Sequence, residues 1–153
     1  MNTEQLNCAI RENKCLTLLV KGVYSPDTLP INVTSYPSAY ISNTDLSHLP
    51  GRHWIVIWFR SPYYAEFYDS LGKPPDHYNT HFLHFMDRNA MDFVYIDTAV
   101  QENDSDVCGY HVLYYLLMKC FGVNLSDMKD FLHETISPDR FVYRYVSDYF
   151  KCL

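Results

Sequence analysis

The sequence lacks three features that would assign it to common classes of protein: a long apolar run, an excess of positive charge and a paired-cysteine motif. Its longest apolar segments are interrupted by charged residues, so we expect no membrane-spanning helix. The opening MNTEQLNCAIRENK has no apolar core of the secretory-signal type, so we expect a protein that is not secreted. A formal net charge of −6 argues against duplex nucleic acid as an obligate partner.

The five cysteines are scattered and odd in number, which predicts free thiols in a reducing compartment. A zinc site could be drawn from Cys108, His111, Cys120 and His133. No CxxC or HxxxH pair supports it, so we favour the absence of a metal and expect no cofactor.

The chain has enough apolar residues to form a hydrophobic core. Hydrophobic residues make up 48% of its 153 positions and aromatic residues 16%. This length and composition predict one domain, residues 1–153, that folds around its own core.

The apolar pattern predicts an α+β fold, with a small central mixed β-sheet flanked by helices that form one layer on it. The strands are expected at 16–20, 39–42, 53–59, 65–68 and 93–96. The expected helices are one capped by Asn2 or Thr3, one over 77–89, one from Cys108 to near Gly122, one capped by Ser126 and one starting at Ser137-Pro138-Asp139.

Cys108 stands where a polar run, Glu102 to Asp106, meets a long helical pattern of apolar residues. Asp104, Ser105 or Asp106 is expected to cap that helix. In the first turn of a helix, unpaired N–H groups and the positive end of the dipole stabilise a thiolate. Cys108 is therefore a candidate nucleophile, and the alternative is a small core residue that happens to begin a helix.

Three further residues lie at the ends of neighbouring predicted strands. His53 opens the central strand and Asp69 closes its hairpin partner, so the two are expected side by side. An imidazole can take a proton from a thiol, and a carboxylate can orient the imidazole. Gln101 follows the next strand, and its amide can donate to an oxyanion together with the backbone N–H of Cys108. Each residue alone also has a structural explanation, as a strand cap, a turn or a solvated loop.

Together these residues carry a family resemblance. His53-Trp54, Tyr68-Asp69-Ser70, Gln101 and Asp106-Val107-Cys108-Gly109-Tyr110 resemble the adenovirus-type (adenain-like) cysteine proteases and the related SUMO-specific proteases. The order His, Asp, Gln, Cys is the order of that superfamily. The Asp69-Ser70-Leu71-Gly72 segment followed by Pro74-Pro75 is similar to proteases of large DNA viruses and virus-like mobile elements.

The resemblance implies an adenain-like fold and a thiol endopeptidase that cuts viral precursor proteins, often after Gly-Gly or Gly-x-Gly, in the virion and in the host nucleus or cytoplasm. Cys108 would be the nucleophile, His53 the base, Asp69 its orienting group and Gln101 the oxyanion donor. Trp54 and Gly109 would bind substrate, with Trp54 covering a narrow groove.

Two features differ from the adenovirus enzymes. Residues 90–100 contain no cysteine to which an activating peptide could be disulfide-linked, although an activator held without a disulfide stays open. The charge of −6 argues against a DNA cofactor. Two alternatives also stay open: an isopeptidase that removes a ubiquitin-like protein, and a catalytically inactive assembly or binding module. The sequence does not determine the oligomeric state.

Overall fold

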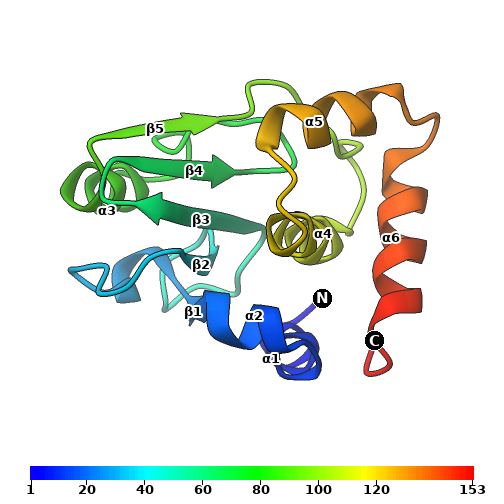
Figure 1. Cartoon of the computed structure of the whole chain (residues 1–153), viewed down its shortest axis with the longest axis horizontal. Coiled ribbons are helices and arrows are strands. Elements are labelled where there is room, and N and C mark those ends of the chain that lie inside the picture. The colour runs from blue at the N-terminus through cyan, green and yellow to red at the C-terminus, as the bar shows by residue number, and fades with distance from the viewer.

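A five-stranded mixed sheet forms the centre of the protein, whose computed structural model describes residues 1–153 (Figure 1). The strands follow one another in the order of the chain: β1 Val20–Tyr24, β2 Ser38–Asn43, β3 Trp54–Ser61, β4 Tyr64–Tyr68 and β5 Asp92–Tyr95. The outer pairs β1–β2 and β4–β5 are parallel, and the inner pairs are antiparallel. The predicted mixed sheet and the hairpin between β3 and β4 are therefore confirmed.

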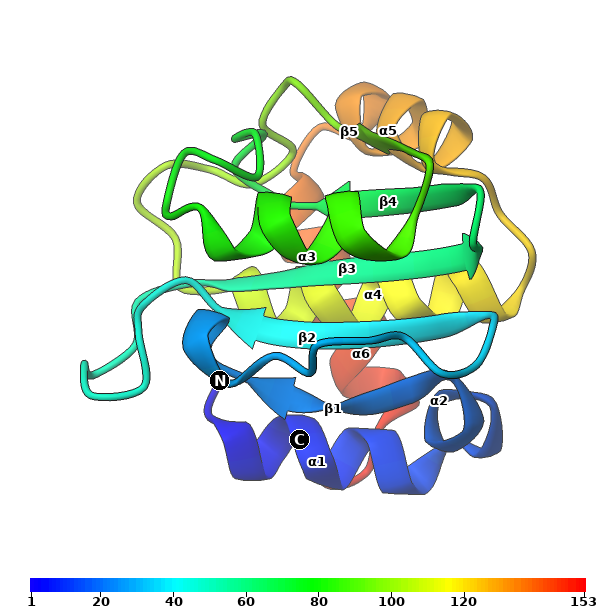
Figure 2. The ribbon, with the colours of Figure 1, turned by 90° about the vertical axis from the view of Figure 1, so that its left-hand side faces the viewer.

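Helices cover both faces of this sheet, so the expected single layer of helices is wrong (Figure 2). On one face lies α3, His81–Asn89; the other face carries α1 Thr3–Glu12, α2 Lys14–Leu19, α4 Cys108–Cys120, α5 Leu125–Glu134 and α6 Pro138–Tyr149. Strand β3 is apolar on both sides because each of its faces packs into a hydrophobic core. Val56 packs with α4, whereas Ile55 and Ile57 pack with the phenylalanines of α3.

The first segments show where a sequence pattern succeeded and where it failed. Asn2 caps α1 and Gln5 reaches back to it, which completes the predicted capping box. The strand expected over 16–20 is wrong, because residues 14–19 form helix α2. Asn13 caps that helix, and its buried leucines, Leu16 and Leu19, are three apart on one face.

The expected caps of two later helices are also wrong. Val107, not an acidic residue or serine of 104–106, is the N-cap of α4, and it makes no side-chain cap. Asn124, not Ser126, caps α5 and accepts from the backbone of Asp127. Helix α3 begins at His81 rather than near residue 77.

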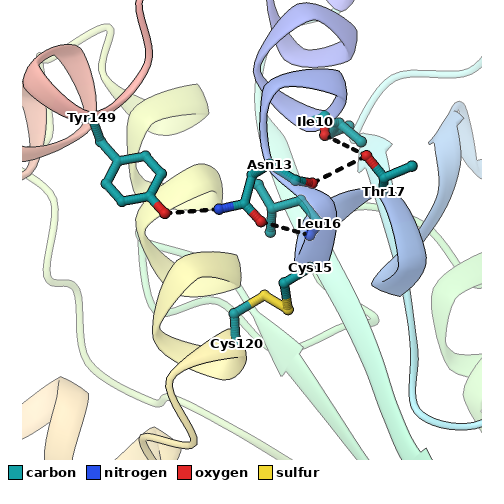
Figure 3. The surroundings of a disulfide bond; sticks show 7 residues. All are labelled: Ile10, Asn13, Cys15, Leu16, Thr17, Cys120 and Tyr149. Atoms are coloured by element: carbon teal, nitrogen blue, oxygen red, sulfur yellow. Dashed lines mark hydrogen bonds between the residues drawn. A yellow bond between two sulfur atoms is a disulfide. The ribbon is translucent and has the colours of Figure 1, made fainter.

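A disulfide joins Cys15 of α2 to Cys120 at the end of α4, which corrects the expectation that every cysteine is a free thiol (Figure 3). The two residues are 105 positions apart, so nothing in their local sequence indicates the pairing. Cys8, Cys108 and Cys152 are the free cysteines. None of the helices combines the length and the apolar character that crossing a bilayer would require.

Candidate active site

His53 and Asp69 are neighbours because β3 and β4 are antiparallel. His53 directly precedes β3 and Asp69 directly follows β4, so the start of one strand lies beside the end of the other. The Nε2 atom of His53 lies 2.6 Å from Oδ1 of Asp69, and both residues are buried. The imidazole is thereby held in one orientation.

The Asp69 carboxylate has three further partners that fix it in place. Oδ1 also accepts from the backbone N–H of Leu71, at 2.9 Å, and Oδ2 accepts from Lys73 N–H at 3.2 Å. The hydroxyl of Tyr78 donates to Oδ2 at 2.7 Å. Sequence analysis missed Tyr78, and no local signal marks it. These contacts stabilise the ionised carboxylate. Burial raises the pKa of Asp69, but the hydrogen bond and charge of His53, with the hydrogen bonds from Leu71 and Tyr78, lower it overall.

Cys108 lies beside the same imidazole, and both residues line one groove. Each of the two groups shifts the pKa of the other. Burial lowers the pKa of His53, but Asp69 and Cys108 outweigh burial and raise it to about 9. Burial raises the pKa of Cys108, yet the hydrogen bond and charge of His53, with a backbone hydrogen bond from Trp54, lower it overall. These opposite shifts favour a thiolate–imidazolium pair near neutral pH.

Gln101 reaches the site on a loop that is tied to the end of β4. The backbone N–H groups of Val100 and Gln101 both donate to the Ser70 carbonyl, at 2.9 and 3.0 Å. The Ser70 hydroxyl donates to Oε1 of Gln101 at 2.6 Å, and Nε2 of Gln101 donates to the Ser105 carbonyl at 2.7 Å. An amide nitrogen carries two hydrogens, so one is left for an oxyanion. Ser70, which follows Asp69 directly, was not predicted to position Gln101.

A groove of about 1050 Å³ runs along the site and is lined by His53, Trp54, Gln101 and Cys108. Met1 also lines it. The indole Nε1–H of Trp54 donates to the Met1 carbonyl at 2.9 Å. A Cβ built on Gly109 would lie 2.6 Å from the Cβ of Met1, so the Met1 side chain packs directly on this glycine. Trp54 and Gly109 thus both contact Met1 at the wall of the groove.

The zinc site drawn from the sequence is not formed. Cys120 is in the disulfide, and His133 lies on α5 with its Nε2 3.4 Å from the hydroxyl of Thr98. His111 is fully buried and is bonded through Nε2 to Asp139, at 2.8 Å. Because Asp139 also accepts from the backbone of Glu102 at 3.2 Å, this pair ties the start of α6 to the loop that follows Gln101.

No protein-family model matches this sequence, and no curated protein sequence does. Among solved structures, the chain is similar to the crystal structure of ASFV pS273R protease, with 19% identity and a TM-score of 0.50 over 75% of this chain and 43% of that one. A selenomethionine crystal structure of the same protease matches at 22% identity and a TM-score of 0.46, over 71% and 43% of the two chains. This chain therefore spans less than half of the length of the protease. At this identity the likeness establishes the fold, and the predicted α+β architecture is that of a viral cysteine protease.

Proposed function

We propose that this chain is a cysteine endopeptidase in which Cys108 is the nucleophile, His53 the general base and acid, and Asp69 the group that orients His53. The observation that carries the proposal is that His53 is bonded to the buried Asp69 carboxylate at 2.6 Å, while Cys108, whose pKa His53 lowers, lines the same groove as His53. A nucleophile, a base and an orienting group in this order are the requirements for thiol acyl transfer.

The proposed reaction has two halves. The Cys108 thiolate attacks the scissile carbonyl, and the oxyanion receives hydrogen bonds from the free amide hydrogen of Gln101 and the backbone N–H of Cys108. The N–H of Cys108 is available because the first N–H groups of a helix have no intrahelical acceptor. The imidazolium of His53 then protonates the leaving amine as the carbon–nitrogen bond breaks. Water, deprotonated by His53, hydrolyses the thioester and regenerates the thiol.

The groove supports a preference for glycine next to the scissile bond. Met1 lines the groove with its carbonyl bonded to the indole N–H of Trp54 and its side chain packed on Gly109. A substrate residue without a side chain fits most easily where Met1 leaves so little room over Gly109. We therefore propose precursor proteins of a virus or a virus-like element as substrates, cut after Gly-Gly or Gly-x-Gly during virion maturation.

A panel of short peptides tests this function. Peptides whose acyl side ends in Leu-x-Gly-Gly or Leu-x-Gly-x are incubated with the wild-type chain and with Cys108→Ala, and cleavage is mapped by mass spectrometry. We expect the wild type only to cut at the end of the acyl segment, and we expect no cleavage when a bulky residue replaces the final glycine of that segment. Folded SUMO and ubiquitin fusions are run in parallel, because a deconjugating enzyme needs the larger surface of its folded substrate.

The outcomes separate the candidate functions. Cleavage of the fusions without the peptides would replace this proposal with a deconjugating isopeptidase. If neither is cut, lysate from cells that express partner proteins is added to supply an activator. Continued inactivity, with Cys108 no more reactive toward iodoacetamide than Cys8, would indicate an inactive binding module.

A further inference from the structure

A second cluster of reactive side chains lies where the end of the chain meets the first helix. It contains Cys8 and Glu12 of α1 and Cys152 of the segment after α6, with one ligand atom from each residue within 4.8 Å of the other two. We propose that these three side chains form a binding site for a thiophilic divalent cation, Zn²⁺, that joins the two ends of the chain.

The fold holds these residues together by several independent contacts. Cys8 and Glu12 are four positions apart on α1, so both side chains lie on one face of the helix. The backbone N–H of Lys151 donates to Oε2 of Glu12 at 2.9 Å, which places Cys152 beside this face. Nearby, the amide of Asn13 donates to the hydroxyl of Tyr149 at 2.8 Å and ties the end of α6 to the start of α2 (Figure 3).

The chemistry of these ligands favours zinc over harder cations. Two thiolates and a carboxylate bind Zn²⁺ at about 2.3 and 2.0–2.2 Å, whereas Mg²⁺ and Ca²⁺ prefer sites made only of oxygen. Around a tetrahedral ion, two such sulfurs would lie about 3.8 Å apart. The ligand atoms of the cluster, which lie within 4.8 Å of one another, are close to that spacing. Cys8 and Cys152 are half-buried and Glu12 is exposed, so an ion can enter from solvent and water can fill the fourth position.

Binding would stabilise the packing of α1. This helix carries the cluster toward its C-terminal end, while Asn2, its N-cap, follows Met1, which lines the groove. A cation bound here would hold α1 against the C-terminal segment and would stabilise the folded chain, because the unfolded chain does not bring the three ligands together.

Metal binding can be tested directly in a Cys108→Ala background, which removes the remaining free thiol as a ligand. Co²⁺ is titrated into the full chain, and sulfur-to-cobalt charge transfer and ligand-field bands in the absorption spectrum report thiolate coordination. Zn²⁺ is then added to displace the Co²⁺, and thermal unfolding is followed with and without Zn²⁺. We expect one Co²⁺ per chain, bands of tetrahedral type, displacement by Zn²⁺ and a higher Tm with Zn²⁺ than with a chelator.

Variants of the cluster and a matched control decide which residues bind. Cys8→Ser and Cys152→Ser should each abolish the charge-transfer bands, and Glu12→Gln should weaken Co²⁺ binding at least tenfold. Glu4→Gln removes the same charge from the same helix outside the cluster and should leave binding unchanged. Absence of thiolate bands in the parent, or bands that persist in both serine variants, would overturn the proposal. So would an intact mass and peptide map that show Cys8 and Cys152 joined in a disulfide in the protein as isolated. None of these readouts depends on peptidase activity, so they are independent of the proposed function.

Discussion

Replacing Asp69 by asparagine would test the central electrostatic argument about the candidate site. The pKa of His53 is raised from its ordinary value of 6.5 to about 9, and Asp69 is the first of the two partners that raise it. If Asp69 supplies most of this difference, its charge stabilises the imidazolium by about 2–3 kcal/mol. Removing that charge should therefore lower the equilibrium constant for forming the thiolate–imidazolium pair by about 30- to 150-fold.

The sign of the pH effect follows from the same pair. In the wild type the imidazolium of His53 lowers the pKa of Cys108, so the thiolate forms below the ordinary thiol range. In Asp69→Asn the pKa of His53 falls and that of Cys108 rises, so the midpoint of thiol reactivity moves to higher pH. Peptide hydrolysis should fall further, by about 10³–10⁴-fold, because the amide also fails to hold the required imidazole tautomer.

The assay is the rate of Cys108 alkylation by iodoacetamide between roughly pH 5 and pH 10, a range that brackets the ordinary pKa values of imidazole and thiol groups, with the label mapped by mass spectrometry. It needs no substrate. Tyr78→Phe removes one hydrogen bond from the same carboxylate but keeps its charge, and it should change the rate less than tenfold. Asp97→Asn removes a charge that is 73% exposed and should change nothing. Circular dichroism checks that each variant is folded. An Asp69→Asn protein that is folded and has the wild-type pH profile would refute the reasoning.

Three further changes test what supports the site. Gly72→Ala should lower the free energy of unfolding by several kcal/mol and loosen the turn after Asp69. This glycine has a φ of +68°, and an added Cβ would lie 2.4 Å from a backbone carbon of the neighbouring loop. Urea unfolding measures the loss, and a loss below about 1 kcal/mol would contradict this. Reduction of the Cys15–Cys120 disulfide should lower the free energy of unfolding by about 4–5 kcal/mol in the chain-entropy account, since the closed loop spans 105 positions. An unchanged Tm with dithiothreitol would show that the bond adds little stability. Glu66→Gln should lower the free energy of unfolding by about 3–5 kcal/mol, because it leaves Lys119 buried without a counter-charge. The Lys119 side chain is 4% exposed and lies 2.7 Å from Glu66. The double variant with Lys119→Met should be more stable than the single variant, and the opposite order would contradict the argument.

The sequence by itself determined the elements that carry the proposed chemistry. The helical pattern after Cys108 and the apolar runs beginning at His53 and ending at Tyr68 predicted a helix and a hairpin that the structure contains. These patterns are reliable because each arises from residues close together in the chain that must bury one face. The antiparallel hairpin then sufficed to place His53 beside Asp69.

Only the tertiary structure decided contacts between residues that are distant in the sequence. The pairing of Cys15 with Cys120 and the bond from Tyr78 to Asp69 have no local signature, because they depend on how α2 packs against α4 and on the path of the loop after β4. The short run before β1 was predicted as a strand and is a helix, since the cap at Asn13 and burial against the other helices outweigh a weak local preference. Met1 likewise lines the groove only because α1 packs beside the sheet and places the residue before its N-cap beside Trp54, a placement that follows from packing and not from local sequence.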